Sequence, residues 1–108
     1  RGDTIINDVA ISEHVIVSVG SSKTYVYSNS DGFPKIAEIE TGGGSVSTSG
    51  DLLVIGDGYA NNDEGVAYLY RTDGTLVKVL DRNINAIGPR FGYSVDITDE
   101  KVIVGASH

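Results

Sequence analysis

The feature that most constrains this sequence is an internal repeat. Three segments begin with a short alternating stretch, pass through a tight polar turn and continue into an apolar stretch ending in glycine, at 9–20, 46–56 and 95–105. A Tyr-x-Tyr stretch followed by an Asp-Gly dipeptide comes after the first two, at 25–32 and 68–74. Asp-Gly between strand-like runs indicates a β-hairpin, because glycine adopts the positive φ that the turn needs. A further strand-like stretch follows, so each complete repeat predicts four short strands in a meander.

Residue usage favours the same fold class. The chain has 108 residues, with 13 Val and 11 Ile against five Leu. β-Branched side chains lose rotamer freedom in helices and fit the pleated surface of a sheet. No stretch of ten or more residues has helical periodicity. We therefore predict an all-β chain.

The second strand of each repeat is a nearly continuous apolar run, at Val15–Val19, Leu52–Ile55 and Val102–Val104. Such runs indicate strands covered on both faces, as in sheets stacked on neighbouring sheets. The tyrosines of the Tyr-x-Tyr stretches alternate with apolar residues, so we expect one tyrosine face of the sheets to be packed or interfacial.

A four-stranded repeat with a spacing of 37 to 49 residues is typical of a β-propeller blade. We predict two whole blades, at 7–42 and 43–83, and the first half of a third at 90–108. A closed propeller needs about four to eight blades, and the chain supplies about two and a half. We expect either a larger protein continuing on both sides or several copies closing the ring. We favour the larger protein, because open ends would leave unpaired strand edges.

The stretch from 90 to 107 carries a family resemblance. It reads Arg-Phe-Gly-Tyr-Ser-Val-Asp-Ile and then Val-Ile-Val-Gly-Ala-Ser, and it resembles the FG-GAP repeat, which begins with Phe-Gly and ends with Gly-Ala-Pro. Phe91 and Gly92 supply the start, and Gly105 and Ala106 supply the end. We interpret all four as structural: an aromatic ring fills the gap between blades, and glycine permits close backbone approach.

The resemblance extends to 52–70, where an apolar strand leads through an Asp/Asn/Gly-rich loop into a Gly-x-Ala-Tyr-x-Tyr strand. Membership of this family, which includes the N-terminal propeller of integrin α-chains, implies an extracellular or cell-surface setting. It also implies a protein partner in recognition or adhesion. Calcium-binding members carry their ligands in the turn between the first two strands of a blade. Here those turns, 12–14, 48–51 and 98–101, are short and poor in ligands, so we expect no calcium site of that type.

The loop at 57–65 is the most polar cluster of the sequence. Five of its side chains offer carboxylate or amide oxygens, which hard cations such as Ca²⁺ prefer: Asp57, Asn61, Asn62, Asp63 and Glu64. Their spacing does not match the EF-hand calcium loop. An alternative function is therefore a calcium- or carbohydrate-binding module that uses this loop together with Tyr59.

Other chemistry is scarce. The net charge is −7 with basic residues scattered singly, and no apolar run is long enough to cross a membrane, so we expect neither nucleic-acid binding nor membrane insertion. There is no cysteine, and His14 has no accompanying nucleophile. Glu38 and Glu40 indicate a solvated outer strand, and Asp96 and Asp99 are interpreted as turn residues. We predict no enzyme activity in the chain itself, although FG-GAP-like blades also occur as accessory segments of larger hydrolases.

Overall fold

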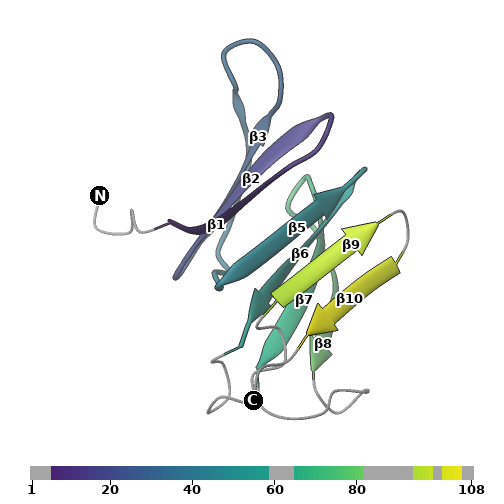
Figure 1. The fold of residues 1–108 in the computed structure, drawn as a ribbon. Helices are drawn as coiled ribbons and strands as arrows, with labels where there is room; N and C mark the ends of the chain where they lie inside the picture. The colour runs from purple at the N-terminus through teal and green to yellow at the C-terminus, as the bar shows by residue number, and fades with distance from the viewer. Residues whose placement is uncertain (1–5, 59–64, 82–93, 99–100, 106–108) are drawn as a thin grey trace.

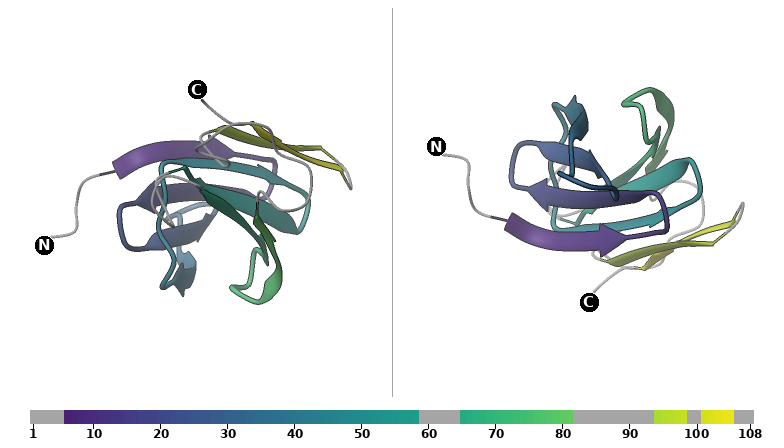
Figure 2. Two further views of the ribbon diagram at one scale, coloured as in Figure 1. Left: turned by 90° about the horizontal axis from the view of Figure 1, so that it is seen from below. Right: turned by 90° about the horizontal axis from the view of Figure 1, so that it is seen from above.

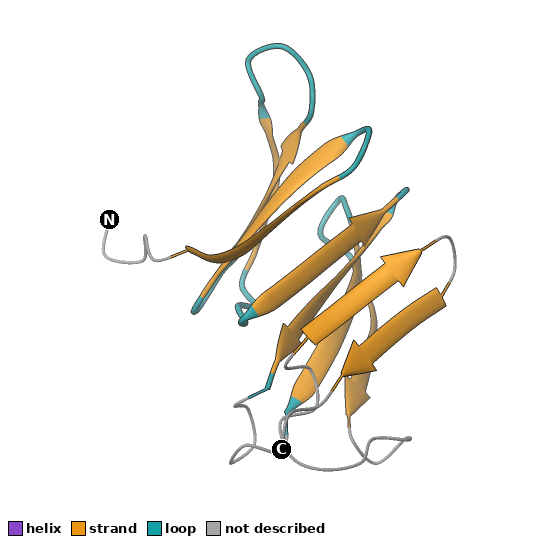
Figure 3. Ribbon diagram, viewed as in Figure 1, coloured by secondary structure: helices purple, strands orange, loops and turns teal. Residues whose placement is uncertain are grey.

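A computed structural model describes residues 6–58, 65–81, 94–98 and 101–105 of the chain. Over these residues the chain is all-β, as predicted, with loops between antiparallel strands (Figure 3). The first sheet has the order β1-β2-β3-β4 and the second β5-β6-β7-β8, while β9 and β10 form a hairpin (Figure 1). The strands are β1 (Ile6–Ile11), β2 (Val15–Gly20), β3 (Thr24–Ser28), β4 (Lys35–Ile39), β5 (Ser45–Ser49), β6 (Leu52–Asp57), β7 (Val66–Arg71), β8 (Leu76–Asp81), β9 (Ser94–Thr98) and β10 (Lys101–Gly105).

The repeat seen in the sequence is visible in the register of the strands. The pairing of the outer strands shifts at the same place in both sheets, between Val26 and Tyr27 and between Leu69 and Tyr70. The glycines of the two Asp-Gly dipeptides have positive φ, 80° at Gly32 and 99° at Gly74. The two four-stranded sheets can therefore be compared position by position, by structure as well as by sequence. We call these two sheets and the β9–β10 hairpin the three units of the chain.

Each unit has two faces, which we call face A and face B. Residues directly opposite one another on neighbouring strands share a face. Face A of the first sheet consists of the rows Val9, Ser18, Tyr25, Glu38 and Ile11, Ile16, Tyr27, Lys35. The corresponding rows of the second sheet are Val46, Ile55, Tyr68, Val79 and Thr48, Leu53, Tyr70, Leu76. In the hairpin, face A carries Val95, Ile97, Val102 and Val104. Face B carries the alternate residues, such as Val17, Val54 and Ile103.

The units stack with face B of one on face A of the next. The larger core joins the first two sheets: Val15, Val17, Val19, Val26 and Ile39 pack with Val46, Leu53, Ile55 and Tyr70. The smaller core joins the second sheet to the hairpin: Val54 and Ala67 pack with Ile97, and Leu52, Leu69, Leu80, Val95, Val102 and Val104 surround them. Burying a large aliphatic side chain stabilises a fold by about 1.5–3 kcal/mol, so these two interfaces hold the units together.

The prediction of a buried second strand is correct for β2 and β6 and wrong for β10. Val17 and Val54 are fully buried, whereas Ile103 of β10 is 65% exposed. The physical reason is that β10 pairs only with β9 in the described residues, and no sheet there packs on its face B. An apolar strand can be covered on both faces, but it is buried only where another sheet packs against it.

The first strands of the three units, β1, β5 and β9, run side by side (Figure 1), and the turned views of Figure 2 keep them adjacent. Two aspartates join them. Asp8 Oδ2 accepts a hydrogen bond from the backbone N–H of Val46 at 3.1 Å, and Asp96 Oδ1 accepts one from Ser47 Oγ at 3.1 Å. Asp96 lies within β9, so its interpretation as a turn residue is wrong.

The segment 41–44 connects the two sheets closely. Gly43 N donates to Gly20 O at 2.9 Å, and Gly44 N donates to Gly56 O at 2.8 Å. A Cβ on Gly43 would collide with Gly56 O and would lie 2.9 Å from Ile55 Cγ2. The backbone of this junction therefore approaches the second sheet at a distance that excludes larger residues.

Candidate functional site

The loop at 57–65 is described only at its two ends. Asp57 is the last residue of β6, half-buried and opposite Val66. Burial and the nearby Asp57 charge raise the pKa of the Tyr68 hydroxyl. The other proposed ligands, Asn61, Asn62, Asp63 and Glu64, lie outside the described residues, so the calcium or carbohydrate alternative stays a prediction.

Among the described residues, no group of three or more His, Asp and Glu side chains is placed to hold a metal ion. Of the motif residues taken from the family resemblance, Phe91, Gly92 and Ala106 lie outside the described part of the chain. Gly105 is the last residue of β10, opposite Ser94, and a Cβ there would lie 2.6 Å from Ser94 Oγ.

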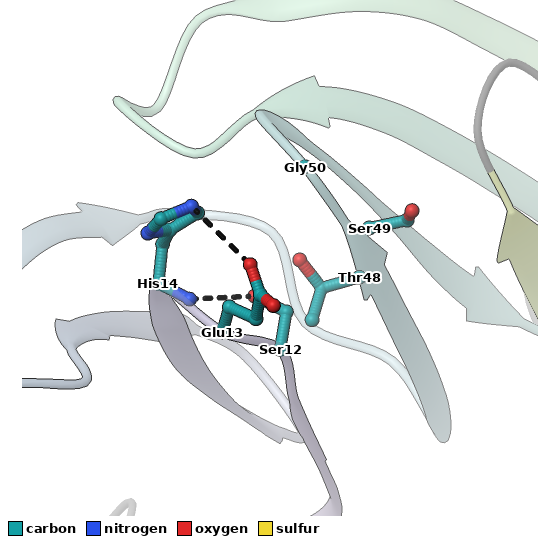
Figure 4. A pocket seen from close by; sticks show the side chains of 6 residues that line it. All are labelled: Ser12, Glu13, His14, Thr48, Ser49 and Gly50. Atoms are coloured by element: carbon teal, nitrogen blue, oxygen red, sulfur yellow. Dashed lines mark hydrogen bonds and ion pairs between the residues drawn. The ribbon is translucent and has the colours of Figure 1, made fainter.

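A depression of about 300 Å³ lies between the turn that joins β1 to β2 and the turn that joins β5 to β6 (Figure 4). Its lining consists of six residues: Ser12, Glu13, His14, Thr48, Ser49 and Gly50. The local sequence shapes both turns. Ser12 Oγ accepts hydrogen bonds from the N–H groups of His14 and Val15, each at 3.3 Å, and Gly50 has a φ of 58°.

The charged side chains at this depression are largely exposed. The side chains of Glu13 and His14 are 92% and 76% exposed, and Glu13 Oε1 lies 3.9 Å from His14 Nε2. Beside the exposed Glu13 carboxylate and His14 ring, the lining includes the half-buried hydroxyl residues Ser12, Thr48 and Ser49.

The depression and the two described ends of the loop at 57–65 lie at opposite ends of the strands. The depression lies where β1 and β5 end, whereas the loop joins the end of β6 to the start of β7. Because β5 and β6 are antiparallel, these positions are separated by the length of a strand. Asp57, where this loop begins, is therefore not part of the depression. The sequence signal that marks the depression, two short polar turns, indicates only a hairpin.

Face A of the first sheet is the other prominent surface. In the described residues, no element packs against it. Val9 and Ile11 are 61% and 68% exposed, and Tyr25 and Tyr27 stack with ring centroids 6.5 Å apart. The expected tyrosine face is therefore packed in the second sheet, where Tyr70 is 8% exposed, and open in the first.

The outer part of this face carries charge. Glu38 accepts hydrogen bonds from Lys23 Nζ at 3.0 Å and from Lys35 Nζ at 3.1 Å. These hydrogen bonds hold the pKa of the Glu38 carboxyl below 4.5. Glu40 follows the last residue of β4, lies 3.9 Å from Lys23 and is 75% exposed, so only Glu38 of the two lies on the outer strand.

No family model matches the chain, and neither the curated proteins nor the solved structures contain a match. The described residues include no helix that could span a membrane. The FG-GAP resemblance therefore rests on the sequence motif.

Proposed function

We propose that this chain is a non-enzymatic protein-interaction module built from blades of the β-propeller type. In this proposal it belongs to an extracellular or cell-surface protein, as the FG-GAP resemblance implies. The single observation that carries the proposal is the stacking order: face B of each unit lies on face A of the next, and the first strands lie side by side. Propeller blades are arranged in this way around a central axis.

The stacking gives the module a rigid framework for recognition. The interface between the first two sheets includes the fully buried Val17, Leu53 and Ile55. It also includes a hydrogen bond between Thr41 Oγ1 and Tyr70 OH at 2.7 Å. A packed interface of this kind fixes the two turns that flank the depression, and loops held on a rigid scaffold commonly carry binding function.

The recognition surface that we propose is the depression between these turns. Glu13 and His14 project from the first turn, while Thr48, Ser49 and Gly50 line the other side. The exposed Glu13 carboxylate and the surrounding hydroxyls favour a protein surface with hydrogen-bond donors and a basic side chain.

The test compares capture of partners by the chain and by Glu13→Lys. Immobilised chain is exposed to extracellular fluid and the bound proteins are quantified by mass spectrometry. We expect a protein retained by the unmodified chain to fall by about tenfold or more with Glu13→Lys, because reversing a contact charge replaces attraction with repulsion. The matched control is Glu40→Lys, an equivalent reversal at the other end of the sheet.

A partner lost with Glu13→Lys and kept with Glu40→Lys supports recognition at the depression. If every captured protein responds equally to the two reversals, or none is captured, recognition at the depression is refuted.

A further inference from the structure

We propose that Phe33 is an aromatic anchor that enters an apolar pocket of a protein partner, and that lysine and arginine side chains surround this pocket. Phe33 lies in the loop at 29–34, which joins β3 to β4 and extends beyond the end of the first sheet (Figure 1). The proposal rests on the proposed function in assigning a protein partner to this end of the molecule. It adds a contact outside the depression and names the chemistry of the partner.

The first argument is that this loop is longer than its counterpart in the second sheet. In the first sheet, Ser28 N donates to Pro34 O at 2.8 Å and closes the loop. In the second sheet, Arg71 N donates to Thr75 O at 2.8 Å. The first bond encloses five residues and the second encloses three, and both sets contain an Asp-Gly dipeptide. The hairpin connection therefore needs no residue at the place of Phe33.

The second argument is the conformation of Phe33. Its φ is 47°, and in the described residues every other positive φ belongs to a glycine. A bulky side chain in this region of φ is strained, and residues of this kind cluster at ligand-binding positions. The ring adds little to the packing of the fold, because Phe33 is 56% exposed. A contact with a partner therefore explains this residue better than the stability of the loop does.

The third argument is that the loop is held in place. Asn29 N donates to His14 O at 2.8 Å, and Asn29 Nδ2 donates to Ser12 O at 3.0 Å. Nearer the tip, Phe33 N donates to Ser30 O at 2.9 Å. The bonds from Asn29 tie the loop to the turn that joins β1 to β2, which also lines the depression. A loop that is already fixed loses little conformational entropy when it binds.

The charge near Phe33 indicates the chemistry of the partner. The four connections at this end of the first two sheets contain neither lysine nor arginine, and each carries one exposed acidic residue: Glu13, Asp31, Asp51 and Asp73. The basic residues at the adjoining strand ends are Arg71 and Lys35, and Lys35 Nζ already pairs with Glu38 at 3.1 Å. An aromatic side chain beside acidic groups is complementary to an apolar pocket with a basic rim.

A lipid surface is the other environment that an exposed aromatic loop residue can enter. Anionic lipids attract basic segments and repel acidic ones, so the acidic connections around Phe33 disfavour this environment. Binding to lipid is therefore a result that would contradict a protein partner.

The experiment places the photoreactive residue benzoylphenylalanine at position 33, which keeps an aromatic side chain there. A second chain carries it at position 6, because Ile6 is 60% exposed at the opposite end of β1. Both chains are irradiated in extracellular fluid, and any protein crosslinked at 33 and not at 6 is identified by mass spectrometry and purified. Its dissociation constant is then measured with the unmodified chain, with Phe33→Asn and with the matched control Ile6→Asn.

We expect Phe33→Asn to bind at least about 30-fold more weakly, because buried aromatic anchors carry a large share of the binding energy. Ile6→Asn should bind as the unmodified chain does. The affinity should fall as salt is added, since charges contribute to the contact. The urea midpoint of Phe33→Asn should be unchanged or higher, because asparagine tolerates a positive φ better than phenylalanine does. Weaker binding without a loss of stability distinguishes an anchor from a structural residue.

The proposal is overturned if no protein is crosslinked at 33 in excess of position 6, or if Phe33→Asn binds as tightly as the unmodified chain. A lower urea midpoint of Phe33→Asn would also overturn it, and so would an affinity that is independent of salt. If the unmodified chain sediments with phosphatidylcholine vesicles and Phe33→Asn does not, the ring is a lipid anchor and the protein partner is refuted.

Glu13→Lys separates this proposal from the proposed function. A crosslinked protein that is lost with Phe33→Asn and kept with Glu13→Lys supports the anchor and refutes recognition at the depression. The reverse pattern refutes the anchor alone.

Discussion

The equivalence of the two sheets predicts that the same truncation has different costs at matched positions. Leu53 and Ile16 hold corresponding places on face A, each between the first strand and a tyrosine of the third. Leu53 is fully buried beneath the first sheet, while Ile16 is only half-buried. Replacement by alanine removes the same number of carbon atoms from each. The difference in cost therefore measures what the covering sheet contributes.

Leu53→Ala should lower the free energy of unfolding by about 3 kcal/mol, because a buried leucine loses its transfer free energy and leaves a cavity. Ile16→Ala should cost about 1 kcal/mol, because part of its side chain already contacts water and no closed cavity forms. The two costs differ by about 2 kcal/mol, so with a urea m-value of about 2 kcal/mol/M the unfolding midpoints of the two variants should differ by about 1 M.

The assay is urea denaturation at a concentration where the chain is monomeric, followed by circular dichroism and by tyrosine fluorescence, since the chain has no tryptophan. If both variants shift the midpoint equally, or if Ile16→Ala is the more costly, the first sheet does not cover face A of the second as described.

Three further predictions concern single contacts, each measured by denaturation. Gly43→Ala should lower the free energy of unfolding by about 1–3 kcal/mol, because the added Cβ would collide with the backbone of β6. Gly44→Ala is the control: its Cβ would meet nothing within 4 Å, so it should leave the stability unchanged or raise it slightly. Equal effects of the two substitutions would contradict the close approach at Gly43. Tyr70→Phe should cost about 1–2 kcal/mol, since Thr41 Oγ1 loses its partner; an unchanged midpoint would show that this bond does not form. Glu38 has a pKa below 4.5 in the folded state because two lysines donate to it, so its contribution is present above pH 4.5 and is lost as the pH falls through the folded value. Glu38→Gln should flatten this acid-side decline, and an identical pH profile would contradict the assignment.

The sequence predicts the strands and their order because the determinants are local. Alternation, β-branched residues and the Asp-Gly dipeptides mark the strands and turns, and Gly32 and Gly74 adopt the positive φ that those turns require. Burial of β2 and β6 follows from their apolar runs. The similar run in β10 remains exposed at Ile103, because exposure depends on whether another sheet covers that face.

The contacts between units are not predictable from local pattern. Asp96 resembles a turn former in the sequence, yet it accepts a hydrogen bond from Ser47 of β5, and Asp8 accepts one from the backbone of β5. Likewise, Tyr27 and Tyr70 have the same local sequence context, but only Tyr70 is buried. Such differences arise from stacking across separations of about 30 to 50 residues, where loop closure and packing decide the partners. The depression between the first turns has the same origin, because its two sides come from different units.

The central claim, that the units stack with face B on face A, is tested most directly by thiol labelling. The chain has no cysteine, so each single substitution reports on one position. The four variants are Ile16→Cys, Leu53→Cys, Val54→Cys and Ile103→Cys. In dilute solution we predict fast labelling at 16 and 103 and strong protection at 53 and 54, because the last two positions are fully buried in the two interfaces. Labelling at 53 as fast as at 16, or at 54 as fast as at 103, would contradict the stacking.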